Sequence, residues 1–140
     1  MIVQGQTYSF RKELYEGVHD LATDTLYIAL YNANADVNLD TTVYTSVNET
    51  TGTGYDAGGK ELDNATVSLD PNTGVVYVSF SNVSWTGASF TCRGALIYNV
   101  TQGNKSIAVL DFGNDKTVSS GTFTVTFPAN NSTNAVIRSV

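Results

Sequence analysis

Apolar and polar residues alternate along most of the chain, as they do in β-strands with one buried face. The clearest case is residues 122–127, where Phe123, Val125 and Phe127 alternate with three threonines. Within residues 25–31, every position after Thr25 carries an apolar or aromatic side chain, so we expect both faces of that segment to be buried. The pattern therefore predicts an amphipathic strand over 122–127 and a central strand over 25–31.

Several other segments also alternate and predict further strands. Residues 65–69 and 76–80 lie on either side of the turn sequence DPNTG, which predicts a β-hairpin. Strands are also predicted over 90–98 and 107–112, with a short one around residues 136–137. This gives roughly seven or eight short strands, a number and spacing typical of an antiparallel β-sandwich or jelly roll.

One short helix is predicted near the N-terminus. Phe10, Leu14 and Val18 recur at four-residue spacing, which places them on one face of a helix of about three turns. Ser9 is a candidate N-cap, and Gly17 lies close to the far end. No other helix alternates with the strands, so a parallel α/β sheet is excluded.

A long polar stretch, residues 32–60, interrupts the strand pattern. We predict a loop there with at most one short strand. Loops of this length inside a compact domain usually carry function.

The composition indicates one polar, largely uncharged domain. Charged residues make up 14% of the chain, against roughly 25% in typical soluble proteins. The length of 140 residues suits a single domain, residues 1–140. We divide it into an N-terminal helical segment over 1–22 and an antiparallel β-sandwich over 23–140. Cys92 is the only cysteine, so packing must hold the fold without an internal disulfide.

The charge and hydropathy exclude two classes of partner. The net charge is −6 with seven basic residues and no basic stripe, so we expect no nucleic-acid partner. No segment approaches the about 20 apolar residues needed to cross a bilayer, so we expect no membrane partner. The opening residues MIVQGQTYSF lack the basic and apolar regions of a secretory signal, which predicts a cytoplasmic product.

Two motif-like strings fail as binding sites when their neighbours are considered. Residues 54–60 match G-x-x-x-x-G-K, but Glu61 stands where a phosphate loop needs Ser or Thr. Residues 36–40 imitate the start of an EF-hand, but glycine and glutamate are missing at the sixth and twelfth positions. An irregular calcium site in that loop stays open as an alternative.

The chain has few residues of the types that serve as catalytic bases, nucleophiles or metal ligands. His19 is the only histidine and is expected to pack or cap the helix end, while Cys92 lies in an apolar strand and is expected in the core. We therefore predict no catalytic residue, no cofactor and no metal, and not an enzyme. A set of aromatic residues could stack on sugar rings or could instead be core or interface anchors: Tyr27, Tyr31, Tyr55, Trp85 and Tyr98.

Six sequence blocks, in this order, resemble a family of small virion proteins of tailed bacteriophages whose better understood members are capsid cement or decoration proteins. The blocks run nearly from end to end: FRKELYEGVHD, DTLYIALYNANA, YTSVNETTGTGYDAGG, WTGASFTCRGALIYN, AVLDFGNDKTVSSGTFTVTFPA and NAVIR. The resemblance implies a jelly-roll fold and a place on the outer surface of the capsid. It also implies that the major capsid protein is the partner and that the chain self-associates, with a homodimer favoured and a trimer as the alternative.

Function is therefore expected to lie in a surface that binds other proteins and stabilises the shell. We predict that the N-terminal segment and the polar loop form this interface, with Phe10, Tyr15, Tyr44 and Tyr55 as candidate anchors. Two alternatives remain: a tail-fibre or adhesion module that binds host glycans, and a head–tail connector or tail subunit.

Overall fold

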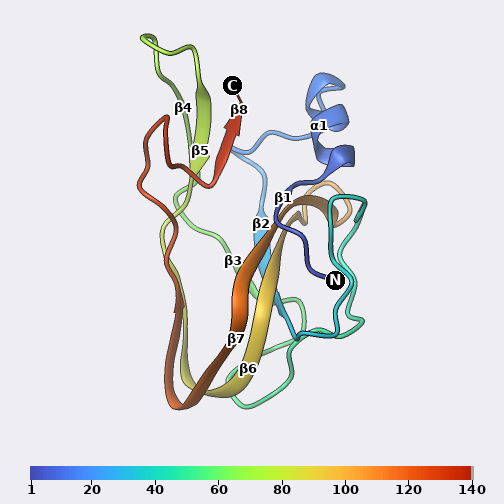
Figure 1. The fold of residues 1–140 in the computed structure, drawn as a ribbon. Helices are drawn as coiled ribbons and strands as arrows, with labels where there is room; N and C mark the ends of the chain where they lie inside the picture. Colours follow the sequence, from blue (N-terminus) through green and yellow to red (C-terminus); the bar gives the residue numbers. More distant parts are fainter. Residues whose placement is uncertain (140) are drawn as a thin grey trace.

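The computed structural model describes residues 1–139, which form eight strands and one helix (Figure 1). The elements in chain order are β1 (Gly5–Gln6), α1 (Tyr8–Tyr15), β2 (Leu26–Tyr31), β3 (Lys60–Glu61), β4 (Thr66–Leu69), β5 (Val76–Ser79), β6 (Val83–Asn99), β7 (Lys105–Val125) and β8 (Ile137–Ser139).

The strands form two antiparallel sheets. The larger sheet has the order β1-β7-β6-β2-β3, and the smaller has the order β4-β5-β8. The all-β class with one short N-terminal helix is thereby confirmed. The predicted hairpin is confirmed as well, because β4 pairs with β5 from Thr66 opposite Ser79 to Leu69 opposite Val76.

The β6–β7 ribbon is the longest feature of the fold. Its pairing runs from Val83 opposite Val125 to Asn99 opposite Lys105, with four register shifts along the way. Such bulges bend and twist a strand pair. Figure 1 shows the two strands running together to the lower end of the molecule, bending there, and returning along the opposite side. The separate strands predicted over 90–98, 107–112 and 122–127 are therefore parts of two long, bent strands.

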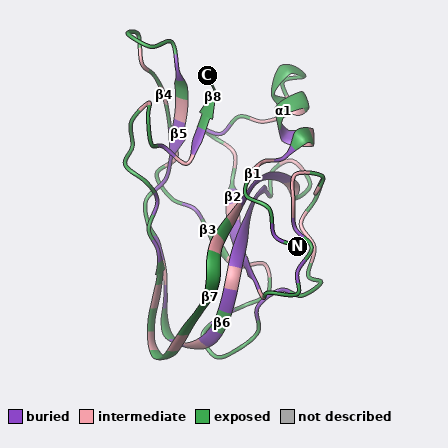
Figure 2. Cartoon of the chain, viewed as in Figure 1, coloured by how far each residue is buried: buried purple, intermediate pink, exposed green. Residues whose placement is uncertain are grey.

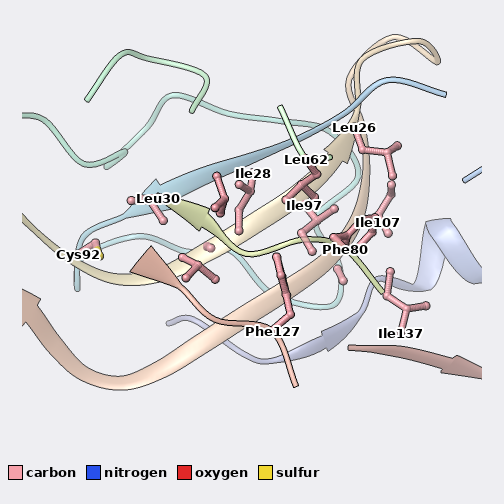
Figure 3. Close-up of a cluster of buried hydrophobic side chains, with 14 of the residues drawn as sticks. Leu26, Ile28, Leu30, Leu62, Phe80, Cys92, Ile97, Ile107, Phe127 and Ile137 are labelled. Carbon is pink, nitrogen blue, oxygen red and sulfur yellow. The ribbon is translucent and has the colours of Figure 1, made fainter. Parts of the chain in front are cut away.

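The main core lies on one face of the larger sheet. Leu26, Ile28 and Leu30 of β2 point into it together with Ile97 of β6 (Figure 3). Cys92 is fully buried in the same cluster, as predicted, and burial raises the pKa of its thiol to about 12.

A second apolar cluster covers the other face of the same sheet. It joins the alternate β2 residues Ala29 and Tyr31 to Ala35 and Val37 of the long polar stretch. Both faces of β2 are thus buried, as the sequence predicted. Residues 32–59 hold no strand and only isolated bridges, which confirms the predicted loop. The loop is a third layer over the sheet.

The helix is shorter than predicted and begins earlier. Thr7, not Ser9, is its N-cap, and its side-chain oxygen accepts a hydrogen bond from the Phe10 amide at 3.3 Å. Thr7 is fixed there because its own amide donates to the Ile107 carbonyl of β7. Gly17, at φ 72°, ends the helix in a Schellman motif in which the Val18 amide donates to the Glu13 carbonyl.

Gly59 permits a close approach between the loop and β2, and its replacement is a test of this packing. A Cβ at Gly59, where φ is 83°, would lie 1.8 Å from the Ile28 carbonyl oxygen. We expect Gly59→Ala to lower the free energy of unfolding by more than about 4 kcal/mol, measured by chemical denaturation. Gly74→Ala is the control, because Gly74 has φ 73° with nothing within 4 Å of its Cβ position. Gly74→Ala should lower the free energy of unfolding by about 1–2 kcal/mol. Equal losses of stability in the two variants would contradict the close approach of Gly59 to β2.

Candidate protein-interaction surface

Two of the four candidate anchors are buried, so their prediction as surface anchors is wrong. Phe10 is 0% exposed because it is the side chain that docks α1 onto the core, with its ring 5.1 Å from His19. Tyr55 is 8% exposed, and its ring packs beside Trp85 and Phe90.

The other two candidates differ from each other. Tyr44 is half-buried, with its ring stacked on Tyr98 at 4.8 Å between centroids. Tyr15 is 94% exposed at the end of α1. Of the four, Tyr15 alone presents most of its side chain to solvent.

A buried carboxylate explains why Tyr44 and Tyr55 point inward. Glu49 is 7% exposed; one of its oxygens accepts from the Tyr44 hydroxyl at 2.5 Å. The other oxygen accepts from the Tyr55 hydroxyl and from the Gly58 amide, the latter at 2.8 Å. Tyr55 also accepts from the Leu30 amide at 2.9 Å, which links the carboxylate to β2. These bonds tie the long loop to the sheet, and they occupy the Gly58 amide within the phosphate-loop-like string.

The phenols around Glu49 stay protonated donors far above neutral pH. Burial, followed by the nearby Glu49 carboxylate, raises the pKa of Tyr31 and Tyr55 well above the ordinary value of about 10. The same two causes raise the pKa of Tyr44, and they raise that of Tyr98 to about 12. The cluster therefore serves to hold the loop.

His19 belongs to a second buried polar group, next to α1. Its Nε2 lies 2.9 Å from Glu13 Oε1, and its Nδ1 lies 3.0 Å from the Asn99 amide nitrogen, which also donates to Asp24 at 2.8 Å. The histidine side chain is 0% exposed. His19 thus joins the segment after the helix to the end of β6, a packing role that matches the prediction.

A groove opens between α1 and the smaller sheet. It has a volume of about 910 Å³, with β1 at its floor, α1 on one side and β5 and β8 on the other. Figure 1 shows α1 and the β4–β5 hairpin projecting at the same end of the molecule, and Figure 2 shows that most of α1 is exposed.

Exposed apolar side chains gather on both sides of this groove. Tyr8, Leu14 and Tyr15 of α1 line it, and so does Val76 of β5. Leu69, which is 62% exposed, lies directly opposite Val76 in the hairpin and extends the apolar strip. We call these five residues, with the groove, the groove surface.

The apolar face of the hairpin is buried near the body of the molecule and exposed near the tip, and a second segment bonds to the opposite face. The Asn130 side chain donates to Thr66 Oγ1, and the Ser132 hydroxyl donates to Asp70. Thr66 and Asp70 lie on the face of β4 opposite to Leu69, since side chains alternate along a strand. Val78 lies on the same face as Val76 and Leu69 and is buried in the main core opposite Ile137 of β8, so the apolar face is open only toward the tip of the hairpin.

Of the two alternatives for the aromatic set, the core role holds for four of the five residues. Tyr31, Tyr55, Trp85 and Tyr98 are buried and Tyr27 is partly buried, so they form no sugar-stacking platform on the surface. Asp36 in the calcium-like string instead accepts from the N-terminal amine at 3.0 Å. Within residues 1–139, no three His, Cys, Asp or Glu side chains are placed to hold a metal ion.

Sequence reasoning missed both Glu49 and the groove surface. Glu49 is the only charged residue between Asp40 and Asp56, a signal that could have singled it out. The exposure of Leu69 and Val76 had no such signal, because alternation does not tell how far along a strand the apolar face is covered.

Comparison with known proteins gives no relative: no protein-family model, curated protein or solved structure matches this chain. In the described part of the chain, no helix is long and apolar enough to cross a membrane.

Replacing Glu49 by Gln tests the carboxylate that holds the loop. The amide keeps one acceptor oxygen, so at least one buried donor loses its partner whichever way the amide turns. We expect the free energy of unfolding to fall by roughly 2–4 kcal/mol in urea denaturation. Glu61→Gln, at an exposed position of β3, is the control and should change it by less than about 0.5 kcal/mol. Similar losses in both variants would refute the role of Glu49.

The buried phenols predict a loss of stability at high pH. Above about pH 10 the unfolded chain releases phenolic protons that the folded protein keeps, so the unfolded state binds fewer protons and stability falls as pH rises. Each such phenol contributes a slope of up to about 1.4 kcal/mol per pH unit. Tyr55→Phe should reduce the slope, whereas Tyr15→Phe should leave it unchanged, in denaturation curves taken from about pH 9 to 11. A slope unaffected by Tyr55→Phe would contradict this account.

Proposed function

We propose that this protein is a structural virion component of a tailed bacteriophage, a capsid cement protein that binds the outer surface of the major capsid protein shell and stabilises it. The observation that carries the proposal is the groove surface. It gathers exposed aromatic and aliphatic side chains on two projecting elements, a composition typical of protein-binding surfaces. The ordered sequence blocks that resemble the cement family support the same class of partner.

The proposal includes a jelly-roll-like arrangement of the two sheets. The strand order supports it, because β1 pairs with β7, β2 with β6 and β5 with β8. In each case a segment returns from far along the chain to lie beside an earlier strand, as it does in jelly rolls.

The mechanical role follows from linkage. A protein that binds only when neighbouring capsid subunits stay adjacent stabilises that arrangement by about 2.7 kcal/mol for each site at a hundredfold excess over Kd. Many copies over the shell add these contributions and oppose the outward pressure of packaged DNA. The protein is made in the host cytoplasm and acts on the capsid surface, where we expect it as a homodimer, with a trimer as the alternative.

Binding to shells tests the function directly. Purified protein should bind shells of the major capsid protein of the phage that encodes it and raise their disruption temperature. The double variant Tyr15→Ala/Leu69→Ala removes the two most exposed apolar side chains of the groove surface and should weaken binding at least about tenfold. Val47→Ala is the control, because Val47 is 69% exposed but lies in the loop.

Two results would contradict the proposal. One is a wild-type protein that does not bind the shells. The other is immunogold labelling that places the protein on the tail or in a single ring at the head–tail junction, as expected of an adhesion module or a connector.

A further inference from the structure

We propose that the groove surface takes an acidic segment of its partner that also carries an apolar side chain. The inference rests on the proposed function in naming that segment as an exposed acidic segment of the major capsid protein. The chemistry of the groove itself is argued from the chain alone.

The first step is the distribution of charge. The chain has thirteen acidic and seven basic residues and a net charge of −6. Arg11, Lys12 and Arg138 nevertheless all line the groove, and none of its lining residues is acidic. The groove is therefore a basic region on an acidic protein, and it attracts negative charge.

The second step is the state of these cations. Lys12 is paired with Glu16 at 2.6 Å. Arg11 is exposed and forms no ion pair within residues 1–139. Arg138 donates from Nη1 to the Ser132 carbonyl at 3.2 Å, which leaves its charge without a carboxylate among the described residues. A guanidinium binds carboxylates through paired, charge-assisted hydrogen bonds. Arg11 is thus the residue best placed to bind an incoming carboxylate.

The third step is the apolar lining. Leu14 and Tyr15 on one side and Val76 on the other offer surfaces that bury aliphatic or aromatic side chains. Nucleic acid fits poorly, because aliphatic walls do not stack bases and three cations are too few to follow a phosphate backbone. A volume of about 910 Å³ accommodates a few side chains of a short segment. An acidic peptide with apolar residues matches all of these features.

A charge-reversal pair tests the inference. Arg11→Glu reverses the cation in the groove, while Lys116→Glu makes the same change of net charge at an exposed position of β7 away from it. Two probes are used: shells of the major capsid protein, and a labelled peptide of alternating Glu and Leu, with a Lys–Leu peptide for comparison. Thermal unfolding verifies that both variants fold. A third variant, Arg11→Gln, removes the positive charge without reversing it.

We expect wild-type protein to bind the Glu–Leu peptide and not the Lys–Leu peptide, with affinity that falls as salt rises. Arg11→Glu should weaken binding to the peptide and to shells at least about tenfold, and Arg11→Gln should weaken both by a smaller factor. Lys116→Glu should change the affinity for either probe by less than about twofold. If the protein binds the peptide but no shells, the acidic-segment inference stands and the proposed function fails.

Three results would overturn the inference. The first is equal binding of the two peptides. The second is equal loss of shell binding in Arg11→Glu and Lys116→Glu. The third is a dimer, seen by sedimentation, that Arg11→Glu dissociates, because the groove would then hold a second copy of this chain.

Discussion

The buried carboxylate of Glu49 accepts hydrogen bonds from Tyr44, Tyr55 and the Gly58 amide, and the architecture of the larger sheet depends on it. That sheet is apolar on both faces. The face that carries Ala29 and Tyr31 is not covered by a second sheet. An irregular loop covers it, and a loop has no ladder of backbone hydrogen bonds to hold it. The three hydrogen bonds to the buried Glu49 carboxylate hold the loop on the sheet instead. Hydrogen bonds to an ionised group are about twice as strong as those between neutral groups.

This anchorage decides where a partner can bind. The sequence pattern indicates a binding role for the long loop, but Tyr44 and Tyr55 of this loop pack against the protein's own sheet. The elements that project from the body are α1 and the β4–β5 hairpin, and they carry the exposed apolar residues Tyr15 and Leu69. The loop residues therefore stabilise the fold, while α1 and the β4–β5 hairpin form the surface that binds a partner.

Local patterns were enough to predict part of this structure. The two apolar faces of residues 26–31, the hairpin around DPNTG and the buried Cys92 follow from alternation and turn chemistry alone. The N-cap at Thr7 and the burial of Phe10 and Tyr55 depend on partners far along the chain, such as Ile107 and Leu30. Each bulge in β6 and β7 shifts the alternation by one residue, which looks like the end of a strand in a period-two pattern. The groove surface was missed because coverage of a face is a tertiary property.

The central claim is that the loop is a structural layer and the groove surface is the binding face. Hydrogen exchange of the backbone amides, measured by mass spectrometry with and without capsid shells, tests both halves at once. The account predicts slow exchange of the bonded loop amides of Tyr44, Thr50 and Gly58, which shells leave unchanged. It also predicts new protection over α1 and the β4–β5 hairpin when shells are present. New protection confined to residues 41–58, with α1 and the hairpin unaffected, would contradict it.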